Sequence, residues 1–193
     1  LRKLHVPGDP LLLANVWDPT SARIVEAAGM RAIATASNAL APVNGYEDHG
    51  HLPPDVAFGA LRRITDAVKL PVTADLEDGY GLSPEDFVER LFSAGACGAI
   101  LEDTDHRVGA LVDAERQAER IASVKAAARA RGFNPVINAR IDVFFHKAPL
   151  EEGLKRARKY LDAGADCIDP IFEFDVSAIR EYVALGPTNV LYG

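Results

Sequence analysis

Carboxylate side chains gather in two short stretches, each directly after an apolar run: Asp75-Leu76-Glu77-Asp78-Gly79-Tyr80-Gly81 and Leu101-Glu102-Asp103. Side chains alternate along an extended strand, so Asp75 and Glu77 are expected to project to the same side. Two carboxylates held together repel each other unless a cation lies between them, and Mg2+ takes oxygen ligands of this kind. Acids at strand ends can also cap helices or stay solvated. Together, Asp75, Glu77 and Glu102 predict a Mg2+ site, with Mn2+ as the alternative ion.

An arginine occupies the corresponding place in a later stretch. Residues 136–142 begin apolar and then present Asn138, Arg140 and Asp142 on one face. A guanidinium directed into a ring of acids can bind a substrate carboxylate or phosphonate in two-point geometry while the metal ion holds the opposite end. The alternative is a plain salt bridge from Arg140 to Asp142 or Glu102. We predict that Asn138 and Arg140 bind substrate and that Arg140 also acts in catalysis.

Small polar residues and a tryptophan add further candidates for substrate binding. The backbone amides of Ser37, Asn38 and Ala39, together with the Ser37 hydroxyl, could hold an anionic oxygen. Trp17 is expected to line the floor of the pocket, although a purely packed tryptophan is the alternative.

The stretch 44–51 resembles a lid and contributes the remaining candidates together with the loop after Glu102. Asp48 could reach the ion through water, so we predict it as a metal-site and catalytic residue. His49 and His51 lack the spacing of metal ligands and are expected to be surface histidines. His106 is predicted as the general acid or base, with Asp105 as the alternative.

A repeated local pattern indicates how these residues are positioned. Three helices end at Ala-Gly, at positions 28–29, 94–95 and 163–164, and each is followed by an apolar strand that closes on a polar residue. This pattern implies parallel strands joined by crossover helices, which place polar residues at one edge of the sheet. Seven strands are predicted, over 12–16, 32–35, 72–75, 99–102, 136–139, 167–169 and 189–191, and the longest helix over 113–131.

Seven repeats are one short of the eight that close a (β/α)8 barrel of the TIM type. We therefore predict one α/β barrel domain over residues 1–193 that lacks its last strand and helix at the C-terminus. The alternative is a doubly wound open sheet. That fold is usually marked by a glycine-rich phosphate loop after its first strand, where this chain has Asn15-Val16-Trp17-Asp18-Pro19.

Composition narrows the possible partners and location. The net charge of −7 argues against a nucleic-acid partner, because phosphate neutralisation needs a basic face. No apolar run reaches the roughly 20 residues that cross a bilayer, so we expect no membrane partner and a cytoplasmic enzyme. Cys97 and Cys167 enter two strands at equivalent places and are expected to be packed, inert thiols.

Over nearly its whole length, the chain resembles the isocitrate lyase / phosphoenolpyruvate mutase superfamily. The resemblance is carried by Asn15-Val16-Trp17-Asp18 with Ser21-Ala22-Arg23, then Gly45-Tyr46-Glu47-Asp48, the segment from Asp75 to Gly81, Leu101-Glu102-Asp103 and Asn138-Ala139-Arg140, in that order. It implies a (β/α)8 barrel in which Asp75 touches Mg2+ while Asp48, Glu77 and Glu102 act mostly through water. It also implies that Arg140 and the segment 37–39 bind a small oxo-acid substrate, and that the chain forms a homo-oligomer, a dimer or tetramer that exchanges its eighth helix.

The sequence departs from the superfamily pattern in two places. Glu77 is more usually aspartate, and the longer side chain is expected to change the water shell. The loop 104–109 lacks the cysteine that isocitrate and methylisocitrate lyases use as an acid or base, and the lysine- and asparagine-bearing lid of phosphonate-acting members is absent. We therefore expect a Mg2+-dependent lyase that cleaves a C–C bond next to a 2-oxo or 2-hydroxy carboxylate through an enolate. A C–P hydrolase or mutase acting on a phosphonate, and a non-catalytic oxo-acid-binding homologue, are the alternatives.

Overall fold

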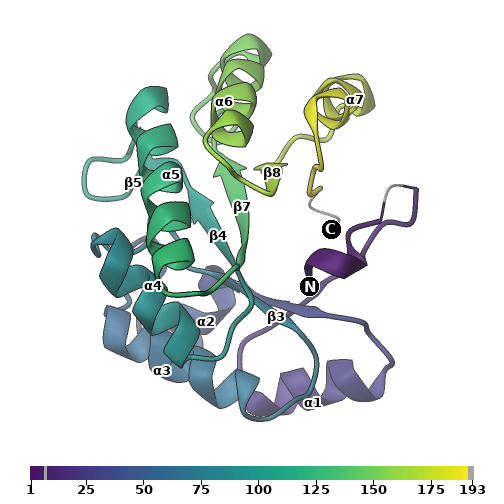
Figure 1. Cartoon of the computed structure of the whole chain (residues 1–193), viewed down its shortest axis with the longest axis vertical. Coiled ribbons are helices and arrows are strands. Elements are labelled where there is room, and N and C mark those ends of the chain that lie inside the picture. Colours follow the sequence, from purple (N-terminus) through teal and green to yellow (C-terminus); the bar gives the residue numbers. More distant parts are fainter. Residues whose placement is uncertain (7, 191–193) are drawn as a thin grey trace.

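The structure is a computed structural model of the chain and describes residues 1–6 and 8–190 (Figure 1). Six parallel strands form one sheet in the order β1-β2-β3-β4-β7-β8. Their bounds are β1 (Ala14–Val16), β2 (Ile33–Thr35), β3 (Val72–Asp75), β4 (Gly98–Glu102), β7 (Val136–Ile141) and β8 (Cys167–Pro170). A short antiparallel hairpin, β5 (Thr104–Asp105) and β6 (Ala110–Leu111), follows β4.

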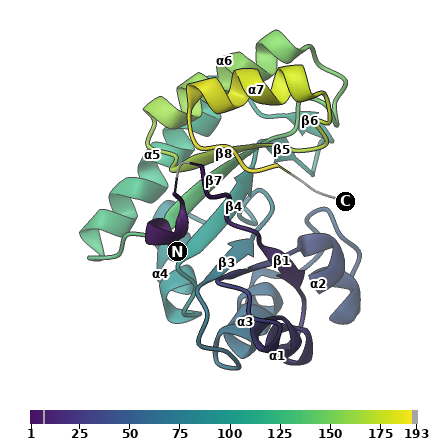
Figure 2. The same ribbon diagram turned by 90° about the vertical axis from the view of Figure 1, so that its right-hand side faces the viewer.

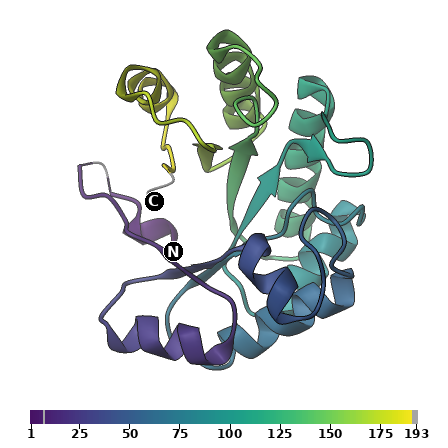
Figure 3. The same cartoon turned by 180° about the vertical axis from the view of Figure 1, so that it is seen from behind.

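Among the described residues, seven α-helices lie outside the curved sheet, and Figure 3 shows their ring interrupted between the first helix and the last. They are α1 (Pro19–Ala27), α2 (Ser37–Val43), α3 (Pro54–Thr65), α4 (Pro84–Ser93), α5 (Ala114–Ala130), α6 (Leu150–Asp162) and α7 (Val176–Leu185), preceded by the 3-10 helix η1 (Arg2–Leu4). Within the described residues β1 and β8 are the two edges of the sheet and do not pair with each other. The described residues thus form the predicted parallel α/β barrel architecture, open between β1 and β8.

Local sequence explains where these elements begin and end. Gly29, Gly95 and Gly164 have φ of 84°, 77° and 102°, the left-handed conformation that stops a helix, as the Ala-Gly pattern predicted. Ser83 caps α4 by accepting a hydrogen bond from the Asp86 amide at 3.1 Å. The longest helix is α5, which confirms the prediction over 113–131.

The predicted seventh strand is the least complete match. Within the described residues only an isolated parallel bridge joins Ile168 to Thr188, and the Asn189 amide donates to the Ile168 carbonyl at 2.7 Å. Leu191 of the predicted strand lies outside the described residues. The hairpin β5–β6 was not predicted, because two-residue strands leave no periodic signal.

The two ends of the sheet differ in what they carry. Figure 2 shows the hairpin β5–β6 and α2 at one end of the sheet and η1 at the other. The carboxyl ends of the strands, with Asp75 and Glu102, lie at the same end as the hairpin β5–β6 and α2. Among the described residues, no helix is both long and apolar enough to cross a lipid bilayer.

Candidate metal and substrate site

The strand register aligns the predicted site residues in two rows across the sheet. Glu102 of β4 is paired with Arg140 of β7. Two residues earlier along these strands, Ile100 is paired with Asn138 and with Asp75 of β3, so the three residues lie side by side on neighbouring strands. Paired residues of parallel strands point to the same face, so Asp75, Glu102, Asn138 and Arg140 share one face of the sheet, as predicted.

The side chain of Glu77 lies beside the same residues, but the turn after β3 places it there, not the alternation of side chains along the strand. Strand β3 ends at Asp75, and Glu77 lies in the following turn with a φ of 50°. Its side chain is 1% exposed, and its Oε2 accepts a hydrogen bond from the amide of Gly50. Its Oε1 is buried and has no hydrogen-bond partner among the described residues. One oxygen of this carboxylate is therefore still open to a ligand.

Three side chains converge closely enough to hold a metal ion. One ligand atom each from Glu77, Glu102 and His106 lies within 4.8 Å of the other two. The Nε2 atom of His106 contacts Glu102 Oε1 directly and lies 3.9 Å from Glu77 Oε2. Two buried carboxylates and an unpartnered oxygen are a donor set that fits a divalent cation.

The electrostatics of this cluster also favour a cation. Burial raises the pKa of Glu77 to about 7; the Gly50 amide opposes this shift, and the charges of Asp48 and Glu102 reinforce it. Burial likewise raises the pKa of Glu102, against the lowering effect of His106 and Arg140. Glu102 is paired with Arg140 and His106, whereas Glu77 has, among the described residues, only His106 at 3.9 Å, so an ionised Glu77 destabilises the folded protein unless a cation binds.

Asp75 lies beside this cluster and is held by the backbone. Its Oδ2 accepts from the Ser37 amide at 3.0 Å and its Oδ1 from the Glu77 amide at 3.3 Å. Its own amide donates to Thr35 Oγ1 at 3.0 Å. These bonds join β2, β3 and α2 at the rim of the sheet. Direct contact between Asp75 and an ion remains a prediction.

Arg140 forms salt bridges to both Glu102 and Asp142, the alternative to substrate binding that the sequence offered. Its Nη1 lies 2.5 Å from Glu102 Oε2, and its Nε donates to Asp142 Oδ1 at 2.7 Å. Neither contact uses Nη2, so one edge of the guanidinium can still meet a substrate anion. Substrate binding by Arg140 and Asn138 remains a prediction.

A buried network fixes the ends of β4 and β7, and sequence reasoning did not foresee it. Asp103 accepts from the Asp142 amide at 2.9 Å, from Arg156 Nη1 at 2.9 Å and from the Tyr160 hydroxyl at 2.7 Å. The Thr104 hydroxyl donates to Asp142 Oδ2 at 2.5 Å. These contacts join residues up to 57 positions apart in sequence, and a single sequence carries no signal for such pairings.

Another residue that sequence reasoning missed is Asp169 on β8, which is paired in register with Arg140. It is 3% exposed, and burial raises its pKa to about 6. Its Oδ2 accepts from Asn189 Nδ2 at 3.0 Å. In the sequence, Asp169 is only the polar residue that ends a predicted strand.

The other predicted site residues lie around the same rim. Ser37 to Ala39 form the first turn of α2, whose leading amide already binds the carboxylate of Asp75. Asp48 is half-buried in the stretch 44–51, close enough for its charge to affect Glu77. Trp17 follows β1 and is 40% exposed, so it is not a packed core residue.

The stretch 44–51 packs against the cluster through a glycine and a histidine. A side chain added at Gly50, where φ is 82°, would come 3.3 Å from the Cβ of His106, so glycine permits this close approach. The rings of His49 and His106 lie 5.2 Å apart. His49 and His51 are both exposed, as the surface prediction required.

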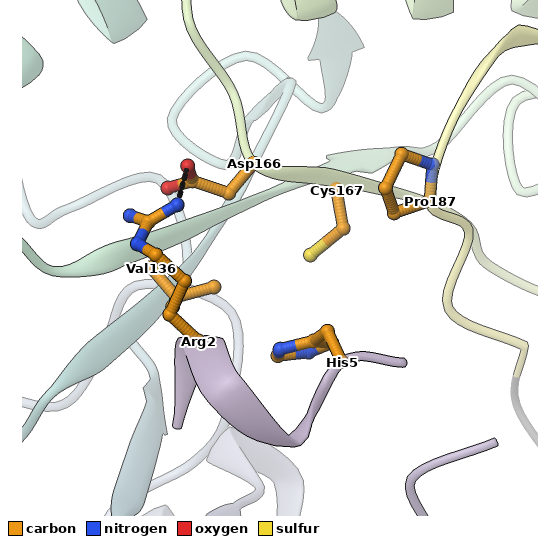
Figure 4. A pocket seen from close by; sticks show the side chains of 6 residues that line it. All are labelled: Arg2, His5, Val136, Asp166, Cys167 and Pro187. Atoms are coloured by element: carbon orange, nitrogen blue, oxygen red, sulfur yellow. Dashed lines mark hydrogen bonds and ion pairs between the residues drawn. The ribbon is translucent and has the colours of Figure 1, made fainter. Parts of the chain in front are cut away.

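A separate cavity of about 180 Å³ lies at the opposite end of the strands (Figure 4). Arg2 and Asp166 form an ion pair of 2.5 Å at one side of it, and the Cys167 sulfur and the His5 ring point into it. Burial raises the pKa of Cys167 to about 12, so its thiol stays protonated and inert at neutral pH. Both cysteines are free thiols, as predicted.

The chain is similar in sequence and in fold to several named proteins. A family model described as phosphoenolpyruvate phosphomutase matches residues 1–192. A 2-methylisocitrate lyase of Salmonella typhimurium is 30% identical over 210 residues, covering 97% of this chain and 70% of that protein. An uncharacterised Mycobacterium tuberculosis protein is 32% identical and covers 84% of this chain, which spans only 61% of that relative. A crystal structure from Burkholderia cenocepacia J2315, described as a candidate phosphonomutase, has a TM-score of 0.89 and 43% identity, covering 98% of this chain and 80% of its own.

Proposed function

Because the chain belongs to the phosphoenolpyruvate phosphomutase family, we propose that it is a lyase dependent on a divalent cation. The reaction proposed is cleavage of a C–C bond next to a 2-oxo or 2-hydroxy carboxylate through an enolate. The cation predicted from sequence is Mg2+, with Mn2+ as the alternative. The observation that supports this most directly is the position of Arg140, whose guanidinium adjoins the cluster of Glu77, Glu102 and His106.

Each residue of the rim has a definite part in this proposal. Asp75 would contact the cation and Asp48 would contact its bound water, as the resemblance implies. Glu77 and Glu102, for which the resemblance implies contacts through water, would here hold the cation directly, because their oxygens converge within 4.8 Å. When bound, a divalent cation supplies positive charge that stabilises an oxygen on which negative charge develops. Arg140 would bind the substrate carboxylate through Nη2, while Glu102 and Asp142 fix the plane of its guanidinium.

The remaining predicted residues would complete the substrate pocket. Asn138 lies one row below Arg140 on the same strand face and can hydrogen-bond a substrate oxygen. Ser37, Asn38, Ala39 and Trp17 lie at the adjoining rim, on the first turn of α2 and at the end of β1. The stretch 44–51 covers the cluster from the solvent side and would exclude water during the reaction.

An assay of C–C cleavage tests this proposal. Release of pyruvate, glyoxylate or acetate from 2-hydroxy and 2-oxo di- and tricarboxylates would be followed with and without added Mg2+ or Mn2+. Arg140→Gln and Glu102→Gln should each lower kcat/KM by at least about 100-fold. Arg131→Gln is the matched control and should leave it unchanged, because Arg131 follows the last residue of α5 and forms its ion pair with the exposed Glu89. Activity that survives both site substitutions would reject the assignment.

C–P chemistry is a second candidate, favoured by the 43% identity to the Burkholderia structure described as a candidate phosphonomutase. Phosphate release from phosphonopyruvate would identify a hydrolase, and interconversion with phosphoenolpyruvate would identify a mutase. Calorimetric binding of an oxo acid with no turnover of any of these compounds would instead indicate a binding protein.

A further inference from the structure

We propose that His106 is a nitrogen ligand of the cation site, and that the site therefore selects a first-row transition ion such as Mn2+ or Co2+ over Mg2+. The inference rests on the proposed function only in that both require a cation between Glu77 and Glu102. It replaces the sequence-based prediction that His106 is the general acid or base.

The positions of the donor atoms carry the argument. In a six-coordinate site, ligand atoms that each lie about 2.1 Å from the ion lie about 3–4 Å from one another. The His106 Nε2 to Glu77 Oε2 separation of 3.9 Å falls in this range, and all three donor atoms lie within 4.8 Å. Glu77 Oε1 is buried without a partner among the described residues, so this carboxylate retains a lone pair for an ion. His106 Nε2 and Glu102 Oε1 are in direct contact, and a bound ion would lie between these two atoms.

The surroundings of His106 hold its ring toward the carboxylates. The hairpin β5–β6 is fixed to the end of β7 by the bond from the Thr104 hydroxyl to Asp142, the residue that follows β7. The ring of His49 lies 5.2 Å from that of His106, and a Cβ added at Gly50 would lie 3.3 Å from the Cβ of His106, so little free space remains between them. The side chain is 10% exposed. Ligands that their neighbours hold in place before the ion binds are typical of preorganised metal sites.

The choice of ion follows from the donor types. Mg2+ is bound almost entirely by oxygen, whereas imidazole nitrogen suits first-row transition ions, whose affinity rises from Mn2+ to Co2+. An acid or base must turn its reactive nitrogen to the substrate. Here Nε2 faces two buried carboxylates instead. The remaining alternative is that His106 serves only as a positive counter-ion, which a metal would displace.

Pulsed electron paramagnetic resonance of the Mn2+-loaded protein tests the inference without a substrate. We expect the modulation of a directly bound 14N nucleus in the wild type, its loss in His106→Gln, and its retention in His51→Gln. His51 is the matched control because it lies in the adjoining stretch and binds only the Asp48 carbonyl. The wild-type spectrum decides the question even if a variant folds poorly.

Metal titration gives a second readout. We expect Co2+ to bind the wild type at least about 100-fold more tightly than Mg2+, and His106→Gln to weaken Co2+ binding about 100-fold while changing Mg2+ binding less than about threefold. A wild-type Mn2+ spectrum without nitrogen modulation, or equal affinities for Co2+ and Mg2+, would overturn the inference. Nitrogen coordination without any turnover would support it and contradict the lyase assignment, so the two proposals fail separately.

Discussion

Replacing Glu77 by glutamine should stabilise the metal-free protein, although it removes a proposed functional group. Glutamine has nearly the same shape, and its carbonyl oxygen can still accept the hydrogen bond from the Gly50 amide. It removes the negative charge that Glu77 holds in a buried site beside Asp48 and Glu102. In the proposed site a bound cation would offset the cost of this charge, which is a common compromise between stability and function.

The size of the effect follows from the pKa. A carboxyl pKa raised from 4.5 to about 7 in the folded state corresponds to at most about 3 kcal/mol of lost stability above pH 7. Below about pH 4 the carboxyl is protonated in both the folded and the unfolded state, so the loss is absent. It grows as the pH rises from about 4.5 to 7, because only the unfolded state then releases its proton freely. In a chain of this size, 3 kcal/mol corresponds to about 6–12 °C in Tm.

Urea and thermal unfolding in EDTA at pH 5 and pH 8 would measure this difference. We expect Glu77→Gln to be more stable than the wild type at pH 8, to lose most of that advantage at pH 5, and to gain nothing from added Mn2+. Glu89→Gln is the control, because this exposed glutamate pairs only at the surface, and its free energy of unfolding should change by less than about 1 kcal/mol. A Glu77→Gln protein less stable than the wild type at pH 8 in EDTA would refute the reasoning.

Three further results are expected. Thr104→Val should lower the free energy of unfolding by about 1–3 kcal/mol, because it leaves Asp142 Oδ2 buried without a donor, whereas Thr104→Ser keeps the hydroxyl and most of the stability; equal losses in urea titrations would count against this. Arg140→Lys should raise KM for the substrate more than it lowers kcat, since lysine lacks two-point geometry, and an unchanged KM in steady-state assays would argue against a substrate contact. Mn2+ affinity, measured by calorimetry, should rise between pH 5 and pH 8, because the raised pKa of Glu77 makes the ion compete with a proton; a flat profile would exclude that competition.

Much of the fold followed from local sequence signals. The Ala-Gly helix ends, the Ser83 cap and the apolar strands each report on neighbouring residues, so a single sequence is enough to place them. The parallel register then brings Asp75, Glu102 and Arg140 to one face without further information. This is why the rim of the site could be predicted before the structure was known.

What could not be predicted depends on contacts between distant residues and on backbone that leaves the strand. Strand alternation assigned Glu77 to the right side, but the turn after Asp75 is what brings its side chain to the cluster. The direction of the His106 side chain depends on the hairpin β5–β6, which was not predicted. That hairpin is held by the hydrogen bond from Thr104 to Asp142, which lies 38 positions later in the sequence. Sequence reasoning therefore found the acids, whereas the position of His106 beside them could be seen only in the structure.

The most direct test of the site is a crystal structure of the protein with Mn2+ and oxalate, a small mimic of a 2-oxo acid enolate, read through the anomalous signal of manganese. The site described above predicts one peak within about 2.2 Å of a carboxylate oxygen of both Glu77 and Glu102, with oxalate held between the ion and Arg140. A peak elsewhere, or oxalate bound away from Arg140, would contradict it.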